Sequence, residues 1–344
     1  MNRFGSSILT GICCLAISAC QSTPEALTAD EAVVQPQQLA GFPNFTYQQV
    51  VIEPTSLTFN PTNEVIFPSV IDASYAFAQP LAKYYMYYAP HDAPGGINLA
   101  YSSSLEGPWT EYASNPVIAN NWSPHYAVDH VSSPHAIWVS ETSQIYLYFH
   151  GSNNITRVAN TSDGINFSYD KPVIATSGTF KKIDNLTEVS YARVFKKTIT
   201  RNGSSYKYIM TLMGNNNGTR KIYLCWSNDA RNFSCQNTPL ITPNSSESGG
   251  QFGGPQISSP RYFPWNSKHY VTYNAGSGDI HISEVGSNFT LENHLGVFYD
   301  SVGGAPENSR AASADFRTIG NTMYMFYEVG QRGATKIALA KAPL

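Results

Sequence analysis

The chain has 344 residues, of which 42% are hydrophobic and 13% charged, and its formal net charge is -3. The chain does not have the excess of basic residues that is typical of proteins that bind nucleic acid or anionic membrane surfaces. We therefore expect no nucleic acid as a partner and no membrane contact other than a lipid anchor. A chain of this length can bury a large core in one domain. Tyrosine, with 22 copies, suits strand surfaces and stacking on sugar rings.

The first 19 residues have the pattern of an export signal. Arg3 precedes an apolar run, which ends in small residues just before Cys20. The end of this run, "ISAC", resembles a bacterial lipobox, and the resemblance implies cleavage before Cys20 and lipidation of its thiol. Gln21 follows, which implies sorting to the outer membrane, on its periplasmic or surface face. Because the apolar run is too short for a permanent membrane span, lipid would be the only anchor.

Residues 20–43 lack hydrophobic periodicity and predict a flexible tether, so the folded domain is expected over residues 44–344. Within this domain Cys225 and Cys235 flank the stretch "WSNDARNFS". If this stretch is a hairpin, the two thiols face each other across adjacent strands, and an oxidising compartment would allow a disulfide. Two free buried thiols are the alternative.

Two series of repeats organise residues 44–344. In the first series, four turn segments end at Trp109, Phe167, Phe233 and Phe289, for example "TSDGINF" and "SNDARNF". The second series has five strand–turn–strand segments, such as "SSPHAIWVSETSQIYLYFHG". Together they give four antiparallel strands in each of five units, which predicts an all-β, five-bladed β-propeller. The fifth unit is one strand short, and "FTYQQVVIEP" near the N-terminus is expected to close the ring.

The innermost strands of a propeller begin at one mouth of the central channel, which is the usual place for a ligand. Because residues two apart on a strand point the same way, five pairs are expected to face the channel. These pairs are Phe67 and Ser69, Ser133 and His135, Tyr191 and Arg193, Ser259 and Arg261, and Ser313 and Asp315. The second strand of each unit returns to the same mouth, so His150 is expected beside Ser133 and His135.

The repeated units resemble those of the propeller glycosidases, including glycoside hydrolase families 43, 32 and 117. In family 43, acids that open the first three blades cleave the sugar, and the resemblance implies a glycosidase. This chain departs from that pattern, because Phe67 and Ser133 precede Pro68 and Pro134 where the family has Asp, and Ser190 with Tyr191 replaces the Glu of the third blade. Acids lie just upstream in the same order, and we expect Glu64, Asp129 and Glu188 to be the catalytic candidates, with Glu188 as the general acid. The alternative is that they are solvated loop residues.

A second chemistry uses the channel residues themselves and resembles that of the propeller-fold ulvan lyases, which have seven blades. Arg193 or Arg261 would neutralise a uronate carboxylate, and His135 or His150 would remove the adjacent proton. Tyr191 would protonate the leaving oxygen. The structural alternatives are buried histidines with satisfied hydrogen bonds and an arginine that pairs with Asp315.

The remaining candidates concern binding. Asn215 and Arg220 in "MGNNNGTRKIYLCW" suit sugar hydroxyls and a sulfate or carboxylate, although polar turns have the same composition. No recognised metal-ligand spacing occurs, so we expect no cofactor, with a structural calcium or zinc ion as the alternative. The sequence thus predicts a glycoside hydrolase for an acidic or sulfated glycan, with a polysaccharide lyase second and a non-catalytic glycan-binding lipoprotein third.

Overall fold

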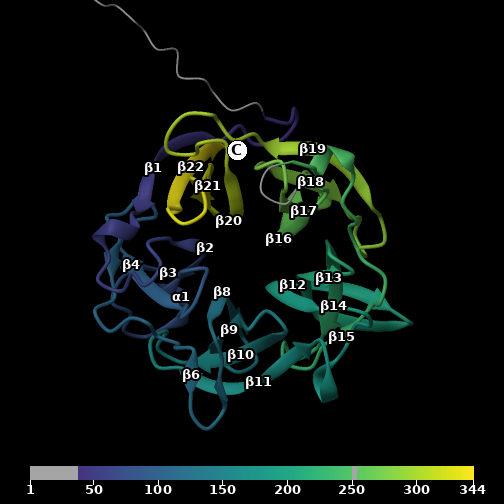
Figure 1. Cartoon of the computed structure of the whole chain (residues 1–344), viewed down its shortest axis with the longest axis horizontal. Coiled ribbons are helices and arrows are strands. Elements are labelled where there is room, and N and C mark those ends of the chain that lie inside the picture. Colours follow the sequence, from purple (N-terminus) through teal and green to yellow (C-terminus); the bar gives the residue numbers. More distant parts are fainter. Residues whose placement is uncertain (1–37, 250–253) are drawn as a thin grey trace, which may run out of the picture. The chain divides into compact units, whose positions relative to one another are not determined.

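The computed structural model describes residues 38–249 and 254–344. The predicted signal peptide, Cys20 and most of the predicted tether therefore lie outside the described residues. No helix in the described ranges is long and apolar enough to cross a membrane. What the structure describes is a ring of five antiparallel sheets, seen along its axis in Figure 1.

Each sheet is one blade with four strands, which confirms the predicted all-β, five-bladed β-propeller. Blade 1 holds β2 (Ile66–Asp72), β3 (Tyr84–Ala89), β4 (Asn98–Ser102) and β5 (Thr110–Glu111). Blade 2 holds β8 (Val131–Val139), β9 (Gln144–Gly151), β10 (Ile155–Thr161) and β11 (Ser168–Ala175). Blade 3 holds β12 (Glu188–Arg201), β13 (Ser204–Asn216), β14 (Thr219–Ser227) and β15 (Ser234–Cys235). Blade 4 holds β16 (Ile257–Trp265), β17 (Lys268–Ala275), β18 (Ile280–Glu284) and β19 (Asn293–Tyr299).

Blade 5 closes the ring as predicted, because its outer strand comes from the other end of the chain. It holds β20 (Ala311–Ile319), β21 (Thr322–Val329), β22 (Lys336–Pro343) and β1 (Thr46–Ile52). β1 pairs antiparallel with β22, from Thr46 opposite Lys341 to Ile52 opposite Ile337. Packing begins before the predicted boundary at residue 44, since the ring of Phe42 lies 5.0 Å from that of Tyr270 in blade 4.

Few elements lie outside the blades. The short α1 (Ala73–Ala76) follows β2, and β6 (Asn121–Trp122) pairs with β7 (Tyr126–Ala127) between blades 1 and 2. Three 3-10 turns cover Pro54–Ser56, Gly178–Phe180 and Ser245–Glu247.

Tyrosines of the second strands lock neighbouring blades together. Tyr87 of β3 donates a hydrogen bond to the carbonyl of Gly164 at 2.8 Å, and Tyr148 of β9 donates one to the carbonyl of Ala230 at 2.6 Å. Gly164 and Ala230 lie in the aromatic-closed turns of blades 2 and 3, both with positive φ. A Cβ atom at Gly164 would lie 2.5 Å from the Phe77 ring, which explains why glycine is needed there. The turn repeats therefore fix the spacing between blades.

Every inner strand contains a bulge near its start. The second, third or fourth residue of each strand has a positive φ, and the pairing register shifts at that point. The five bulge residues are Phe67 (φ 58°), Ser133 (φ 53°), Tyr191 (φ 56°), Ser259 (φ 49°) and Ser313 (φ 50°). Left-handed backbone is uncommon for residues other than glycine, and its recurrence in all five blades marks it as a designed feature of this mouth.

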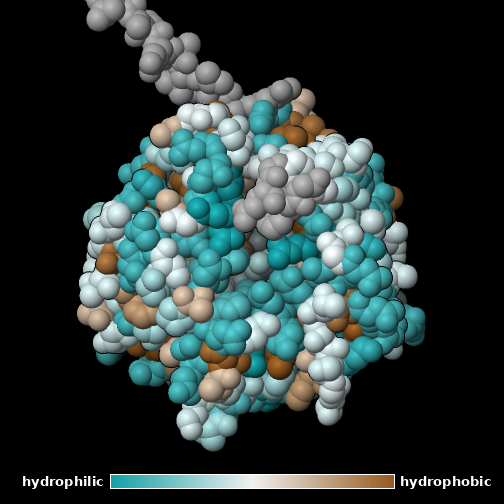
Figure 2. Space-filling model, in the orientation of Figure 1, coloured by the Kyte–Doolittle hydropathy of each residue, from teal (hydrophilic) through white to brown (hydrophobic). Residues whose placement is uncertain are grey.

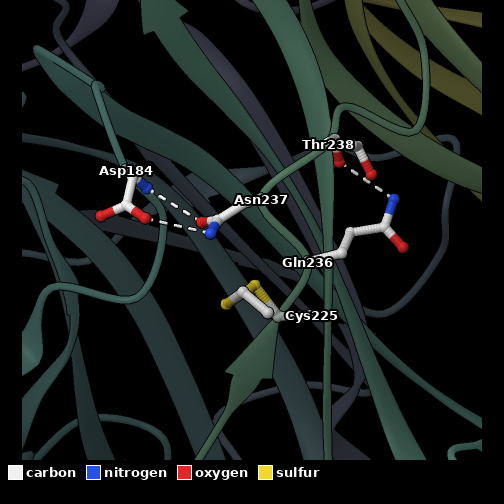
Figure 3. The surroundings of a disulfide bond; sticks show 6 residues. Asp184, Cys225, Gln236, Asn237 and Thr238 are labelled. Atoms are coloured by element: carbon white, nitrogen blue, oxygen red, sulfur yellow. Dashed lines mark hydrogen bonds between the residues drawn. A yellow bond between two sulfur atoms is a disulfide. The ribbon is translucent and has the colours of Figure 1, made fainter.

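Cys225 and Cys235 form a disulfide between β14 and β15, where the two residues face each other in the strand register. Figure 3 shows that the chain beyond the disulfide is also tied to the loop before blade 3. Asn237 exchanges two hydrogen bonds of 3.0 Å with Asp184, one of them from the Asp184 backbone N–H. The disulfide and these hydrogen bonds thus both hold the C-terminal end of the short outer strand β15.

We expect the Cys225→Ala/Cys235→Ala double variant to lose about 2–3 kcal/mol of unfolding free energy, because it frees a loop of this length in the unfolded chain. The cysteines are 10 residues apart in sequence. Denaturant titration measures the loss, and the wild-type protein in reductant serves as the control, since it should unfold at the same midpoint as the variant. A variant as stable as the oxidised wild type would contradict the prediction.

Candidate functional site

A funnel opens at the mouth where the inner strands begin. Its wall comes from the starts of β2, β12, β16 and β20, the ends of β17 and β21, and the segments beside them. The side chains that the site uses are Phe67, His91, Tyr191, Arg220, Asn274, Arg310, Glu328 and Arg332. In the view of Figure 2, hydrophilic residues gather around the centre of the ring. The funnel is therefore a polar pocket in a scaffold whose core is apolar.

The funnel floor is aromatic where family 43 enzymes carry acids. The rings of Phe67 and Tyr191, both bulge residues, lie 4.9 Å apart and form a small apolar cluster with Ile66 and Met213. Burial raises the pKa of Tyr191 to about 12, so its phenol is a neutral donor at ordinary pH. A sugar ring at this floor would contact flat apolar faces rather than a carboxylate.

Two carboxyl groups lie beside this floor, one from the start of an inner strand and the other from near the end of a second strand. Glu188 opens β12, and its Oε1 accepts a hydrogen bond of 2.9 Å from the Ser190 hydroxyl. Glu328 ends β21, and its Oε1 accepts from the Phe67 N–H at 3.0 Å. Tyr191 interacts electrostatically with both carboxyl groups. Glu188 therefore has a second acid near it, although that acid is neither Glu64 nor Asp129.

Three guanidinium groups line the funnel, and each contacts a carboxylate. Arg220 lies 3.5 Å from Glu188, Arg310 lies 2.7 Å from Glu328, and Arg332 lies 3.0 Å from Glu64. Of these three acids Glu328 lines the funnel, whereas Glu188 and Glu64 contact its lining arginines from beside the wall. The side chain of Glu188 is 8% exposed next to Arg220, and that of Glu64 is 1% exposed. A ligand in the funnel would therefore meet three guanidinium groups and Glu328, with Glu188 next to Arg220.

His91 is a further polar group of the funnel wall. Its Nδ1 lies 2.6 Å from a carboxylate oxygen of Asp92, and its ring stacks on Phe67. Burial lowers the pKa of His91, and the charge of Arg332 adds to this shift, whereas Asp92 opposes it. A histidine oriented through Nδ1 by a carboxylate keeps Nε2 for proton transfer. Neither His91 nor Glu328 was a sequence candidate.

Glu64, His91 and Asp92 have ligand atoms within 4.8 Å of one another, a spacing that could hold a metal ion. The guanidinium of Arg332 contacts both acids of this group, at 3.0 Å from Glu64 and 3.5 Å from Asp92. The group is thus a salt-bridge network in which a cationic side chain already balances the acids, and a metal ion would have to compete with it.

The other two acids of the predicted trio lie apart from the funnel wall. Glu64 is 1% exposed, and Arg332, the Gly333 N–H and Thr335 all donate to it. Asp129 is exposed, with a hydrogen bond of 3.4 Å from the Ser152 hydroxyl. These two acids follow the predicted blade order, but neither of them lines the funnel.

The prediction that His135 and His150 face the same mouth is wrong, because the bulge at Ser133 separates them. His150 does lie beside Ser133, whose hydroxyl is 2.5 Å from its Nδ1, and it contacts the Tyr191 ring from behind. His135 lies beyond the bulge and lines a cavity at the opposite mouth. Burial lowers the pKa of both histidines well below the usual range.

Both ring nitrogens of His135 are already used. Its Nε2 lies 2.6 Å from the Val194 carbonyl, and Arg261 donates to its Nδ1 at 3.3 Å. Because a neutral imidazole has one donor and one acceptor, these two contacts leave His135 without a free site for proton abstraction. His135 is therefore a structural residue of the channel.

The predicted binding residues divide between the funnel and the channel beneath it. Arg193 is buried and donates to the carbonyls of Ser133 and Pro134, which holds the blade 2 bulge in place. Arg261 pairs with Asp315 at 2.6 Å, as one sequence alternative proposed. Arg220 lines the funnel, whereas Asn215 faces Glu188 in the strand register and accepts from the Gly218 N–H in the adjacent turn.

No protein-family model and no curated protein matches this chain. Solved structures do resemble it. A glycosyl hydrolase from Bacteroides ovatus has a TM-score of 0.62 at 13% identity, covering 88% of this chain and 95% of its own. A thermostable family-43 glycoside hydrolase has a TM-score of 0.56 at 14% identity, with 80% and 88% covered. The α-L-arabinofuranosidase of Podospora anserina, solved with cellotriose, has a TM-score of 0.58 at 10% identity, with 87% and 96% covered. At these identities the likeness establishes the propeller fold.

Proposed function

We propose that the protein is a glycosidase that cleaves an acidic or sulfated glycan in the funnel. The observation that carries the proposal is the pair of buried carboxyl groups, Glu188 and Glu328, which both interact electrostatically with Tyr191 at the mouth where the inner strands begin. Hydrolysis of a glycosidic bond needs one such group to protonate the leaving oxygen and another to act on water or the sugar. The similar folds of glycoside hydrolases support this reaction class.

We assign the acid role to Glu188 and the second role to Glu328. The Phe67 N–H and Arg310 orient both oxygens of Glu328, so this group is held in one position. In the reaction, Glu188 gives its proton to the leaving oxygen while Glu328 takes a proton from water, whose oxygen bonds to the sugar carbon. Tyr191 and Phe67 would contact the ring between them.

The funnel wall supports the proposal of an anionic substrate. Arg220, Arg310 and Arg332 are 19–22% exposed there, and guanidinium groups form paired hydrogen bonds with carboxylate and sulfate oxygens. Each of these arginines already has a carboxylate partner, so an anionic group of the sugar would share them with Glu188, Glu328 and Glu64.

A lyase is the second candidate, and the pairing of His91 with Asp92 favours it. Here His91 Nε2 would remove the proton next to a uronate carboxylate, Tyr191 would protonate the leaving oxygen, and a carbon–carbon double bond would form in the sugar. This assignment replaces His135, whose nitrogens are both occupied.

The test is to incubate the protein with polygalacturonate, carrageenan and neutral arabinan while reducing ends and ultraviolet absorbance are recorded together. New reducing ends without absorbance, on an acidic polymer only, support the hydrolase. Absorbance that rises with the reducing ends indicates an unsaturated uronate and replaces the hydrolase with the lyase. Cleavage of arabinan alone overturns the anionic substrate, and no cleavage at all supports the glycan-binding alternative.

We also propose that the protein is an outer-membrane lipoprotein attached through Cys20. When the gene is expressed with radiolabelled palmitate in a Gram-negative bacterium, the wild-type chain should carry label and sediment with outer membranes. Cys20→Ser should lose both the label and the membrane association, because the thiol is the attachment point. Cys14→Ser is the matched control and should keep both, and label retained by Cys20→Ser would contradict the anchor.

A further inference from the structure

The opposite mouth of the channel, where the inner strands end, holds a second cavity of about 420 Å³. Its walls include Asp72, Tyr75 and Trp138 near its rim and His135, Arg261 and Arg317 toward the channel. We call this cavity the rear mouth. Its size is in the range of pockets that hold small ligands or single sugar units. The bulge residues and Arg193 lie between it and the funnel, so the two cavities are separate sites.

An exposed aromatic pair forms one wall of the rear mouth. Tyr75 is 75% exposed, and its ring lies 6.0 Å from that of Trp138 in an edge-to-face arrangement. α1, which carries Tyr75, is fixed because Asp72 accepts hydrogen bonds from the Ser74 and Tyr75 N–H groups. An aromatic side chain held rigidly at a pocket rim offers a sugar ring a contact face at low entropic cost.

The charges of the rear mouth do not balance. Asp315 is shared by two guanidinium groups, Arg261 at 2.6 Å and Arg317 at 3.4 Å, and it also accepts the Val70 N–H. Arg193 lies just behind, fully buried. Among residues 38–249 and 254–344 it has no carboxylate within 4 Å, and its Nη2 has no hydrogen-bond partner. His135 adds no charge, because burial and the neighbouring arginines lower its pKa well below the usual range.

We propose that the rear mouth is a second glycan-binding site that takes one acidic unit of a polysaccharide, a uronate or a sulfated sugar. Three guanidinium groups against the buried Asp315 and the rim carboxylate of Asp72 leave this end of the channel with one excess positive charge, and an anionic sugar substituent that reaches Arg261 and Arg317 would balance it. The sugar ring would lie against Tyr75 and Trp138. Asp72 at the rim would accept a sugar hydroxyl with the oxygen that the α1 N-terminus does not use.

A binding site on the opposite face affects polymers and short oligosaccharides differently. A second stretch of one long chain, or a second chain, can occupy it while the funnel is filled, and this raises the effective concentration of substrate. A short oligosaccharide cannot reach both sites at once. Loss of the rear mouth should therefore weaken the binding of polymers and leave the cleavage of short oligosaccharides unchanged.

The experiment is affinity electrophoresis of the mature chain in gels that contain polygalacturonate, carrageenan or neutral laminarin. The Glu188→Gln background keeps the polymer intact, so binding is read without cleavage. We expect Tyr75→Ala to weaken the apparent Kd for an acidic polymer by about tenfold. Arg317→Gln should weaken it similarly. Tyr47→Ala, which removes another partly exposed tyrosine (37%) in blade 5, is the matched control and should bind as the parent.

Equal retardation of Tyr75→Ala, Arg317→Gln and the parent in both acidic gels would overturn the proposal, as would an equal loss in Tyr47→Ala. If laminarin also retards the parent, and Tyr75→Ala reduces that retardation as much as in the acidic gels, the claim that the ligand is anionic is overturned. Thermal melts accompany each variant, and a variant that unfolds early is replaced by Tyr75→Asp, whose added charge should repel the same ligand. Cleavage assays on short oligosaccharides test the proposed function separately, because the rear mouth can bind glycan even if the funnel cuts nothing.

Discussion

Glu188→Gln is expected to reduce kcat/KM on the cleaved glycan by about 10²–10⁴-fold, the usual effect of losing a general acid. The amide keeps the shape of the carboxyl group and still accepts from Ser190, so the fold should be preserved, but it has no proton to give to the leaving oxygen. Initial rates at several substrate concentrations, with reducing ends as the readout, measure the effect.

Asp129→Asn is the matched control for this prediction. It makes the same chemical change at an exposed carboxyl group outside the funnel wall, and its activity should stay within about twofold of the wild type. If Asp129→Asn loses as much activity as Glu188→Gln, the general acid role cannot be assigned to Glu188 alone, and our assignment of the catalytic residues is wrong.

Glu64→Gln is expected to lower the free energy of unfolding by about 3 kcal/mol at neutral pH, because it leaves Arg332 with only its longer contact to Asp92. Burial alone would raise the pKa of Glu64, but the hydrogen bonds from Arg332 and the Gly333 N–H outweigh it and hold this pKa below its usual value. Denaturant titration of both proteins at neutral pH measures the difference.

The direction of the pH dependence follows from that lowered pKa. The folded protein binds the Glu64 proton less readily than the unfolded chain, whose pKa is near 4.5. The ion pair therefore contributes its full stability above the unfolded pKa and loses it as the pH falls through the folded pKa. Between neutral pH and pH values below 4.5, wild-type stability should fall more steeply than that of Glu64→Gln.

Glu53→Gln provides the comparison for this second prediction. Glu53 pairs with Lys336 at 2.7 Å, but both side chains are 35% exposed, so loss of the pair should cost less than about 1 kcal/mol. If Glu53→Gln and Glu64→Gln lose the same free energy of unfolding, burial does not determine how much the Glu64–Arg332 pair contributes to stability.

The blades could be predicted from the sequence because each repeats the same local signals. The aromatic-closed turns recur four times and the strand–turn–strand segments five times, with their partners nearby in sequence, and alternation alone fixes which side chains meet. The closing strand β1 could be predicted because the fifth unit lacks one strand. The Cys225–Cys235 pair could be predicted because the two cysteines flank a turn symmetrically.

The bulges could not be predicted, and they decide which residues meet. The sequence shows "SSP" twice, and the second serine has a positive φ in both copies, but a residue before proline ordinarily favours extended backbone, so the motif does not by itself predict a left-handed residue. A two-residue periodicity breaks at such a point, so residues before and after it face different mouths. That is why His150, beside Ser133, contacts Tyr191 of the funnel, whereas His135 lines the rear mouth.

Glu328 carried a signal that was available in the sequence. The rule that brings His150 back to the funnel, that second strands return to the mouth where first strands begin, applies equally to β17 and β21. Applied to these strands, it would have placed Asn274 and Glu328 in the funnel wall. His91 is harder to predict, because it lies in the connection after β3 rather than on a strand.

The closure of the ring by β1 has a consequence for the order in which the molecule forms. β1 is the first strand to be synthesised, yet its partner β22 lies at the other end of the chain, with all four complete blades between them. Such distant pairing is slow, so β1 remains an unpaired strand until β22 has been synthesised. A nascent chain that pauses before residue 336 would expose both edges of an open ring, and these are the surfaces through which unfinished chains would aggregate or recruit a chaperone.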